Sequence, residues 1–549
     1  RAVRRHMPPH TPLTRKPGEA NRKPCCTANA EEPLENRAAT GMKWFTTHKN
    51  AGGERALPAR EHLYEPPIQW KRKNKMQEQT TELFCRPDTA AKEAPALAAT
   101  VPRILFTGVS SGCGKTTVTC AVLQALVNRG LRLHAFKCGP DYIDPMFHER
   151  VIGATGSNLD LFFYDPDTVR YLLAGNAAEA DVSVLEGVMG YYDGRGIKTL
   201  EKSTYEVARE TETPAILIVN GRGMAFSVTA LIHGFLSAVR ESGIRGVILN
   251  NVSAPTYALL KEAISEQFGG AVQPLGFLPP MKECAFESRH LGLVTAGEIA
   301  DIKAKLNRLA EQAERSIDLD GLLALAEESA PVRYVPVPVR KFEMPVRIAF
   351  AMDRAFCFYY RDNLDLLRQM GAELCSFSPL SDAALPPCDA LYLGGGYPEL
   401  YLEQLSGNVA MRRAVRTALA GGMPCIAECG GFMYLTEAIE GRPMVGALPG
   451  TCKNQGKLVR FGYITLTAKH DNMLCRAGEQ INAHEFHHYD AAVPGDAFSA
   501  CKSRGASWDC AFATERLYAG YPHLPFYANL HFAENFYAAA AAYRLEKEK

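Results

Sequence analysis

The sequence predicts an α/β protein in which two parallel-sheet domains follow an N-terminal leader. Short, β-rich apolar runs alternate with helical patterns from Arg103 onward, and a second series of this kind starts at Val346. In each series a glycine-rich turn follows a predicted strand, which is where open α/β sheets bind their ligands. This alternation favours parallel sheets with helices on both faces, because parallel strands need crossover connections.

The composition of the 549-residue chain is that of a globular protein, with 47% hydrophobic and 22% charged residues. These values exclude a wholly disordered or fibrous chain. The formal net charge of +1 creates no overall field for nucleic acid or an anionic membrane, so we expect neither as a partner. The chain contains no run of about 18 apolar residues, so we expect no transmembrane helix.

The 16 cysteines include no CxxC pair and no zinc-finger spacing. Several, such as Cys120 and Cys425, lie in apolar runs where cysteine usually acts as a small hydrophobic residue. This pattern indicates a reducing compartment rather than a disulfide framework. The N-terminus also lacks the continuous apolar segment of a secretory signal, so we expect a cytoplasmic protein.

Residues 1–100 differ in composition from the rest, with 18 Lys+Arg against 11 Asp+Glu and no sustained hydrophobic periodicity. We predict a disordered basic leader, or upstream sequence included by an early start assignment. A targeting peptide is a third alternative, but the acidic residues Glu31, Glu32 and Glu35 argue against it. The basic run at 71–75 is typical of a solvated tail rather than a nucleic-acid site.

The first α/β series predicts a domain at residues 101–295. Its apolar runs predict short buried strands, and its periodic runs predict helices. The strands are expected at 104–109, 131–138, 182–185, 215–219 and 247–249, and the helices at 116–128 and 227–239. Residues 296–345 are predicted to form a helical segment up to about 328 and then an extended Val/Pro-rich linker from 331.

The second series predicts a domain at residues 346–549. Strands are expected at 346–351, 389–393 and 424–427, with a helix at 363–370. The second of these strands runs into three glycines at 394–396, and the third runs into the turn at 428–431. The sequence contains no internal repeat that would indicate a repeat architecture.

The turn after the first strand has the features of a phosphate-binding loop. Glycines let backbone N–H groups point at phosphate oxygens, and the start of the following helix adds favourable partial charge. Five residues rather than four separate Gly108 from Gly114, so the strict Walker A pattern is missed by one position. The residues predicted to bind nucleotide here are Gly112, Gly114, Lys115, Thr116 and Thr117.

Two acidic residues are candidates to complete a Mg²⁺ site. Asp141 follows the second strand and Glu186 ends the third, so both should lie at the carboxyl edge of the sheet. A carboxylate there can hold Mg²⁺ against a bound triphosphate, and the Thr116 hydroxyl can act as a further ligand. For either acid taken alone, a helix cap or a solvated turn is an equally good interpretation.

Cys429 stands on a tight turn between a short strand and a helix, where small neighbours expose a nucleophile. The helix start lowers a thiol pKa, and the N–H of Gly430 can bind an oxyanion, with Gly395 as a second donor. His531 lies about 100 residues later and is the predicted base. The alternative is a buried structural cysteine with a histidine that faces the core.

A third cluster occurs at residues 484–487, His-Glu-Phe-His. Its spacing differs from that of the helical zinc motif, which places two histidines four residues apart. We therefore expect substrate contact or polar packing there rather than a zinc site.

Taken together, these residues resemble the cobyrinate a,c-diamide synthase family, which are glutamine-dependent amidotransferases of cobalamin biosynthesis. The resemblance runs from about residue 101 to the C-terminus and does not include the leader. It rests most specifically on segments 136–145, 185–194, 392–399, 428–434 and 484–487. It implies a P-loop NTPase-like domain that binds ATP and a corrinoid, followed by a triad-type (class I-like) glutamine amidotransferase domain.

The resemblance also implies roles for particular residues. Asn250 matches a position that recognises adenine, and Tyr142, Ile143 and Asp193 match positions near the acceptor carboxylate. Cys429 matches the nucleophile and His531 the residue that activates it, whereas the third triad member is left open. The implied substrates are glutamine, ATP and a cobyrinate-type corrinoid, with Mg²⁺ as the cofactor. The oligomeric state is not predicted.

Several alternatives share these motifs. Enzymes that act on hydrogenobyrinate or nickel-sirohydrochlorin use similar acceptor carboxylates, and cobyric acid synthase has the same two-domain plan. A partitioning-type P-loop ATPase that binds partners or DNA belongs to another class. The net acidic character of the chain after residue 100 and the Cys429 turn argue against that class.

Overall fold

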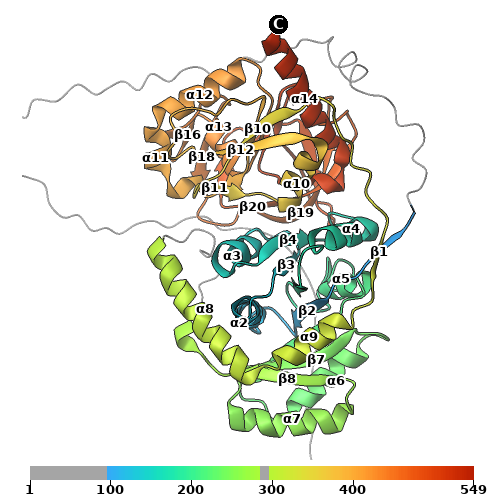
Figure 1. Cartoon of the computed structure of the whole chain (residues 1–549). Helices are drawn as coiled ribbons and strands as arrows, with labels where there is room; N and C mark the ends of the chain where they lie inside the picture. Colours follow the sequence, from blue (N-terminus) through green and yellow to red (C-terminus); the bar gives the residue numbers. More distant parts are fainter. Residues whose placement is uncertain (1–94, 285–295) are drawn as a thin grey trace, which may run out of the picture. The chain divides into compact units, whose positions relative to one another are not determined.

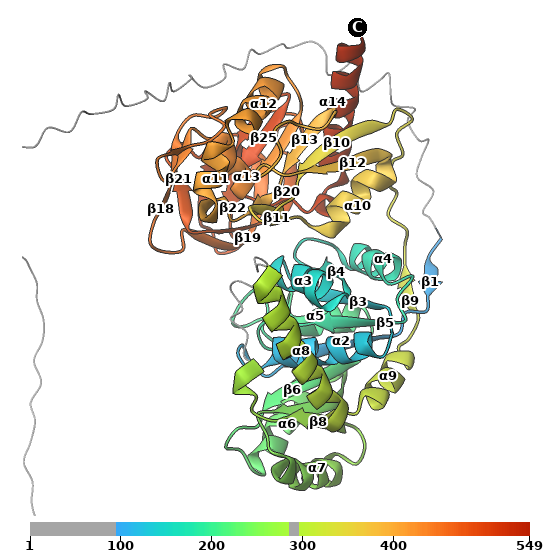
Figure 2. The same ribbon diagram turned by 60° about the vertical axis from the view of Figure 1, so that its left-hand side comes forward.

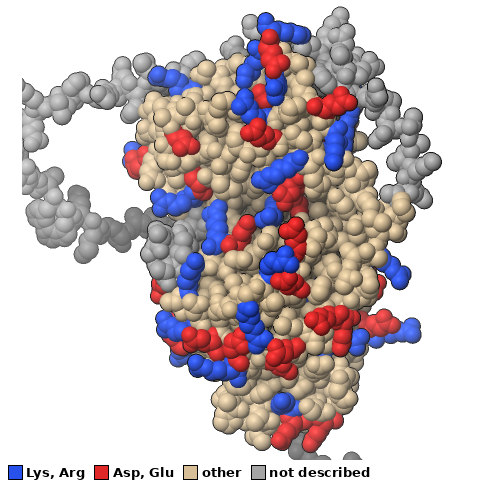
Figure 3. All heavy atoms as spheres, viewed as in Figure 1, with Lys and Arg blue, Asp and Glu red and all other residues tan. Residues whose placement is uncertain are grey.

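The computed structural model describes residues 95–284 and 296–549 (Figure 1). The predicted leader therefore lies almost entirely outside the described residues. Within the described residues, no helix is long and apolar enough to cross a bilayer. Basic and acidic side chains alternate over the face drawn in Figure 3, in keeping with the net charge of +1.

The first domain is built on a seven-stranded parallel sheet with the order β4-β3-β5-β2-β6-β7-β8. β2 (Arg103–Gly108), which precedes the phosphate loop, is the central strand. The other strands are β3 (Leu133–Cys138), β4 (Thr155–Leu159), β5 (Val182–Glu186), β6 (Ala215–Asn220), β7 (Ile244–Asn250) and β8 (Gln273–Leu278).

The strands of this sheet are apolar on both faces because helices cover both faces. On β2, Ile104 and Phe106 pack into one core and Leu105 into the other. The first core is completed by residues of α2 (Lys115–Asn128), α8 (Ala296–Ser316) and α9 (Leu319–Glu327). Helices α2 and α8 lie side by side in Figure 2. The second core includes residues of α4 (Pro166–Asn176), α5 (Thr204–Glu210), α6 (Ser227–Ser237) and α7 (Ala254–Phe268).

The second domain is built on a six-stranded sheet with the order β12-β10-β13-β15-β25-β24. Its first five strands are parallel, and β24 (Phe512–Ala513) is an antiparallel edge. These strands are β10 (Val346–Ala351), β12 (Ala372–Phe377), β13 (Ala390–Leu393), β15 (Cys425–Glu428) and β25 (Leu517–Gly520). The main helices are α10 (Arg361–Met370), α12 (Val409–Ala420), α13 (Gly430–Leu435) and α14 (Leu530–Glu548).

These two sheets confirm the predicted fold class, and the strands predicted from apolar runs are present within one to three residues. The sequence did not reveal an antiparallel sheet formed by β19 (Arg460–Ala468), β20 (Gln480–His487), β22 (Phe498–Cys501) and β23 (Ser507–Cys510). The linker predicted at 331–345 is largely extended but contains β9 (Val332–Tyr334). That strand pairs antiparallel with β1 (Leu97–Ala99), next to the start of the first domain.

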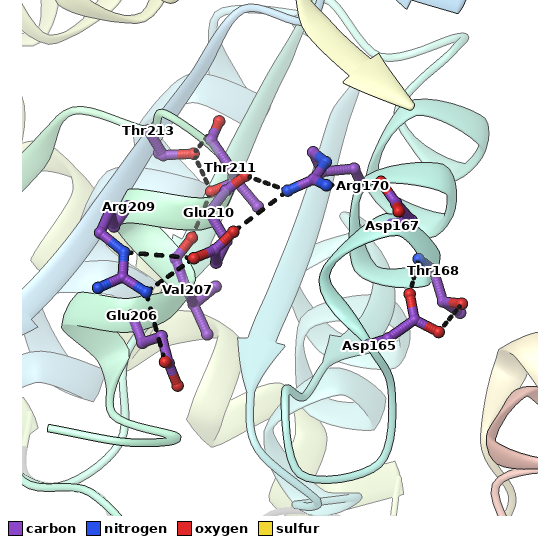
Figure 4. A network of polar contacts seen from close by, with 10 residues as sticks. All are labelled: Asp165, Asp167, Thr168, Arg170, Glu206, Val207, Arg209, Glu210, Thr211 and Thr213. Carbon is purple, nitrogen blue, oxygen red and sulfur yellow. Dashed lines mark hydrogen bonds and ion pairs between the residues drawn. The ribbon is translucent and has the colours of Figure 1, made fainter. Parts of the chain in front are cut away.

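A network of polar contacts joins α4 and α5 of the first domain (Figure 4). Arg170 on α4 pairs with Asp167 at 2.6 Å and reaches the Glu210 carboxylate on α5 at 3.3 Å. At the end of α5, Thr211 donates to the Val207 carbonyl, and its hydroxyl lies 2.7 Å from that of Thr213. The network holds the turn that leads into β6.

Arg103 anchors the same turn from β2. Its guanidinium is fully buried and donates to the Val101 carbonyl at 2.9 Å and to the Thr211 carbonyl at 2.6 Å. All its hydrogen-bond acceptors are uncharged, and burial lowers the pKa of Arg103 to about 10. This side chain therefore serves to pair backbone carbonyls rather than to balance a charge.

Replacing Arg103 by methionine is expected to lower the free energy of unfolding by about 3 kcal/mol, because buried carbonyls at Val101 and Thr211 lose their donors. The shift in urea midpoint measures this loss. Arg209→Met removes a half-exposed arginine from α5 and should stay within about 0.5 kcal/mol of the parent chain. Equal midpoints for the two variants would contradict the anchoring role of Arg103.

Candidate active sites

The first site lies where β2 ends and α2 begins. The loop between them turns through Gly112 and Gly114, whose φ values of 75° and 98° favour glycine. A Cβ on Gly114 would lie 1.9 Å from the Asn250 side-chain nitrogen, so the loop approaches β7 closely. No side chain caps α2, which leaves its first N–H groups available to phosphate oxygens.

Lys115 lies across this loop as the motif predicts. Its ammonium donates to the Ser110 carbonyl at 3.0 Å and to the Met189 carbonyl, on the turn that follows β5. Burial lowers the pKa of Lys115, so this cation gains from an anionic partner. A phosphate bound on the loop would supply one.

Behind the loop lies a buried polar network. The Thr116 hydroxyl donates to Glu186 at 2.7 Å, and Lys137 pairs with Glu186 at 2.9 Å and with Asp144 at 2.5 Å. Burial lowers the pKa of Lys137, but the Glu186 and Asp144 carboxylates raise it by more. Lys137 therefore remains a cation. His148, in the π-helical turn His148–Ile152, faces Glu186 at 3.6 Å.

Asp141 lies near this network, at the carboxyl end of β3. Its carboxylate accepts a hydrogen bond from the Ile143 N–H at 2.8 Å. Burial first, and then Asp144, raise the pKa of Asp141 to about 7. The three predicted metal residues thus lie at one edge of the sheet, because β3 pairs with β5 and Thr116 is bonded to Glu186 at the end of β5.

The donor set here is hydroxyl and carboxylate oxygen, which suits Mg²⁺. Within residues 95–284 and 296–549, no three acidic, histidine or cysteine side chains form a ready-made metal cluster. Mg²⁺ is usually held by one or two carboxylates together with substrate phosphates, so the residues present fit that ion. Thr116, Glu186 and Asp141 would hold it when nucleotide is bound.

The other residues predicted for this site lie at or after the ends of β3, β5 and β7. Asn250 ends β7, and its amide donates to the Cys113 carbonyl of the loop at 3.0 Å. Asp193 accepts from the Gly190 N–H at 2.8 Å in the turn that follows β5. Tyr142 is buried just before Ile143, and its ring lies 5.4 Å from that of Phe358 and 5.0 Å from that of His523. All described residues belong to one compact unit of the chain.

The second site lies where β15 ends and α13 begins. Cys429 occupies the turn with φ 49° and ψ −102°, a backbone conformation that costs energy for a residue with a Cβ. Its N–H donates to the Gly520 carbonyl of β25 at 2.7 Å. A Cβ on Gly431 would lie 2.1 Å from the Leu393 carbonyl, so only glycine fits after the turn. This strand–turn–helix backbone is that of a nucleophile elbow.

The Cys429 thiol itself is buried at this turn. Burial raises the pKa of the Cys429 thiol, the Glu399 carboxyl raises it further, and the Gly430 N–H lowers it. The thiol is therefore neutral at physiological pH and needs a base to become a nucleophile.

Glycines line the other side of the elbow. Gly395 and Gly396 form β14, which pairs with β11 (Phe356–Phe358). A Cβ on Gly430 would lie 3.1 Å from the Gly396 nitrogen, whereas the Gly394 N–H is already bonded to the Tyr359 hydroxyl at 2.8 Å. The predicted oxyanion residues Gly395 and Gly430 thus lie together at the turn, with Gly396 as a further neighbour.

The structure does not bring the predicted base, His531, to this turn by any described contact. His531 is the second residue of α14, its side chain is 68% exposed, and its Nδ1 lies 3.6 Å from Glu479. His523 is the histidine at the elbow. It is 2% exposed, its Nδ1 faces Glu428 at 3.7 Å, and a Cβ on Gly395 would lie 3.4 Å from its Nε2.

Strand pairing explains the position of His523. Glu428, immediately before Cys429, pairs with Gly520 of the parallel strand β25, so the residues after Gly520 reach the same edge as the thiol. Glu428 accepts from the Leu524 N–H at 3.0 Å, which fixes the turn that carries His523. The signal in the sequence is the run Gly-Tyr-Pro-His at 520–523, but the strand before it was not predicted.

The His-Glu-Phe-His cluster lies on β20. His484 exchanges two backbone hydrogen bonds with His523, and His487 stacks on Tyr521 with ring centroids 3.8 Å apart. Burial lowers the pKa of His484 to about 3 and that of His487 to about 4, so both rings are neutral. The cluster packs around the second site, and the described residues show no zinc-type arrangement there.

Two family models match the chain. Residues 104–293 match a CobQ/CobB/MinD/ParA nucleotide binding domain, and residues 347–530 match a CobB/CobQ-like glutamine amidotransferase domain. With the phosphate loop on one domain and the cysteine elbow on the other, the chain is a glutamine-hydrolysing, ATP-dependent amidoligase.

Curated relatives define the family. Cobyrinate a,c-diamide synthases from Listeria monocytogenes (39% identical), Clostridium acetobutylicum (40%) and Salmonella typhimurium (38%) each match 78–79% of this chain and 97–99% of their own length. The chain belongs to the cobyrinate a,c-diamide synthase family.

Proposed function

We propose that this enzyme converts the a and c acetate carboxylates of cobyrinate into carboxamides, with ATP as the activator and glutamine as the nitrogen donor. The names of its relatives support this acceptor. The observation that carries the proposal is the presence of both sites on one chain, the Lys115–Thr116 loop and the Cys429 elbow. A reducing, cytoplasmic setting is part of the proposal, and the free thiols of the described cysteines support it.

The first half-reaction activates the acceptor. A carboxylate cannot lose oxide, so its oxygen attacks the γ-phosphorus of ATP to give an acyl phosphate and ADP. Lys115 and the N–H groups of the loop stabilise charge on the transferred phosphoryl group. Mg²⁺ held by Thr116, Glu186 and Asp141 would supply further charge neutralisation.

The second half-reaction releases ammonia. We propose that His523, rather than His531, accepts the Cys429 proton, while Glu428 faces its other nitrogen and orients the ring. The thiolate attacks the glutamine amide carbon, and the N–H groups near Gly395 and Gly430 stabilise the oxyanion. The C–N bond breaks, His523 returns the proton to the leaving nitrogen, and water hydrolyses the thioester to glutamate.

Ammonia then displaces phosphate from the acyl phosphate and forms the carboxamide. It must remain unprotonated and sheltered from water until it reacts. The ring contact between Tyr142 of the acceptor site and His523 of the glutamine site supports direct transfer.

The histidine assignment gives a direct test. His523→Ala is expected to lower the kcat of glutamine hydrolysis about 10²- to 10⁴-fold, because the buried thiol loses its base. His531→Ala is the matched control and should stay within about twofold, because its ring is exposed and faces Glu479. Glutamate release in a coupled assay measures both variants. The reverse ranking would restore His531 as the base.

The acceptor is tested by incubating the purified protein with Mg²⁺–ATP, glutamine and cobyrinate and following the corrinoid mass. Two successive conversions of carboxyl to carboxamide are expected. Hydrogenobyrinate, nickel-sirohydrochlorin and the cobyrinate diamide, run in parallel, distinguish the related enzymes. No change in mass, with ATP turnover indifferent to the corrinoid, would contradict the proposal.

A further inference from the structure

Three carboxyl groups raise the pKa of the Cys429 thiol, and they differ in the charges that surround them. Glu428 accepts from the Leu524 N–H at 3.0 Å and faces His523. The carboxyl oxygens of Glu485 make no hydrogen bond, but the positive charges of Arg460 and Lys502 lower its pKa against the effect of burial. The third carboxyl, that of Glu399, has the largest effect of the three on the thiol.

Glu399 is held beside the nucleophile by the glycine turn. It lies in the short helical turn Pro398–Leu400, directly after β14 and Tyr397. A Cβ on Gly430 would lie 2.9 Å from the Pro398 ring, so the residue before Glu399 packs on the residue after Cys429. The position of the carboxyl is therefore fixed by the same close packing that forms the elbow.

The Glu399 carboxyl lacks a counter-charge. Its Oε2 atom is buried and makes no hydrogen bond, and no cation among the described residues forms an ion pair with it. Burial raises the pKa of Glu399 to about 7, against the effect of its own backbone N–H. An unpaired buried carboxylate is costly, and a ligand cation would remove that cost.

Glutamine carries such a cation. Two methylene groups separate its amide carbon, which must reach Cys429, from the carbon that bears the α-ammonium group. An ammonium that enters a buried site needs a carboxylate partner. We propose that Glu399 binds the α-ammonium group of glutamine and so selects the free amino acid, an assignment that rests on the proposed glutaminase role of Cys429.

A labelling experiment tests this assignment without ATP or corrinoid. A diazoketone analogue of glutamine keeps the α-amino acid end and alkylates the nucleophilic cysteine, and intact mass follows its reaction at about pH 8, above the Glu399 pKa of about 7. In Glu399→Gln the analogue concentration for half-maximal rate should rise about 10- to 100-fold, the effect of losing one charge-assisted hydrogen bond. The limiting rate should not fall by more than about threefold.

Further variants separate a binding role from a structural one. Iodoacetamide, which has no ammonium group, should label Glu399→Gln at least as fast as the parent chain, because loss of the carboxylate lowers the thiol pKa. Glu399→Asp should recover part of the lost affinity for the analogue. Glu403→Gln is the matched control, because Glu403 is exposed and pairs with Arg442 at 2.5 Å. It should leave both rates unchanged.

The outcomes distinguish this assignment from the proposed function. If the parent chain is not labelled at Cys429 at all, the glutaminase role itself is wrong. If the parent and Glu399→Gln are labelled at the same analogue concentration, or if only the limiting rate falls, Glu399 does not bind the ammonium. A loss of affinity in Glu485→Gln but not in Glu399→Gln would place the ammonium on the other side of the thiol and overturn the assignment.

Discussion

Replacing Cys429 by alanine is expected to lower glutamine-dependent amidation by about 10⁴-fold or more, because no other group can form the thioester. Amidation with ammonium salts should remain within about threefold of the parent rate, because the phosphate loop lies on the other domain. The corrinoid mass and glutamate release measure the two activities on the same sample.

Cys425→Ala is the matched control for this change. Cys425 is a fully buried thiol on β15, the strand that leads to Cys429. Burial raises the pKa of Cys425, and Cys388 raises it further. Cys425 is a packing residue, so Cys425→Ala should amidate the corrinoid with either glutamine or ammonium salts as the nitrogen source. Residual glutamine use by Cys429→Ala above about a tenth of the parent rate would assign the nucleophile elsewhere.

Replacing Lys115 by methionine is expected to lower amidation about 10³-fold with either nitrogen source. The loop would lose the cation that stabilises the transferred phosphoryl group, an interaction made in the transition state. Alkylation of Cys429 by the diazoketone analogue should be unchanged, which shows that the protein is folded. ADP release with ammonium salts as the nitrogen source is the measurement.

Lys261→Met provides the comparison for Lys115, because Lys261 is an exposed lysine on α7 of the same domain. It should retain the parent rate. If Lys115→Met and Lys261→Met release ADP equally fast, the loop at 108–117 does not bind the reacting phosphates.

The sequence predicted the first domain well where apolar runs and glycine turns coincide. The phosphate loop was placed correctly because β2, the turn and α2 are contiguous in the chain. Asp141, Glu186 and Thr116 were predicted to lie at one edge because parallel strands share a carboxyl edge. Thr116 and Glu186 are in contact, and Asp141 lies at the end of the neighbouring strand, while their role as metal ligands stays a prediction. The same reasoning placed Cys429 and its glycines.

What the sequence could not reveal depends on pairing between distant segments. β25 has only four residues, and its position beside β15 brings His523 to the sheet edge that carries Cys429. Without that pairing, His531 was the more prominent histidine in sequence. The Lys137–Asp144 ion pair of the polar network behind the loop was likewise missed, since it depends on the packing of α3 (Ile143–Phe147) against β3.

The pairing of β1 with β9 has a consequence for how this enzyme is divided. Leu97 lies opposite Tyr334 and Ala99 opposite Val332, so the chain enters and leaves the first domain through one hydrogen-bonded ribbon. A domain whose two ends meet can be inserted into, or removed from, another chain without stretching its host. The β1–β9 pairing therefore gives the nucleotide domain adjacent ends, the arrangement that favours recombination of a domain with a different partner domain.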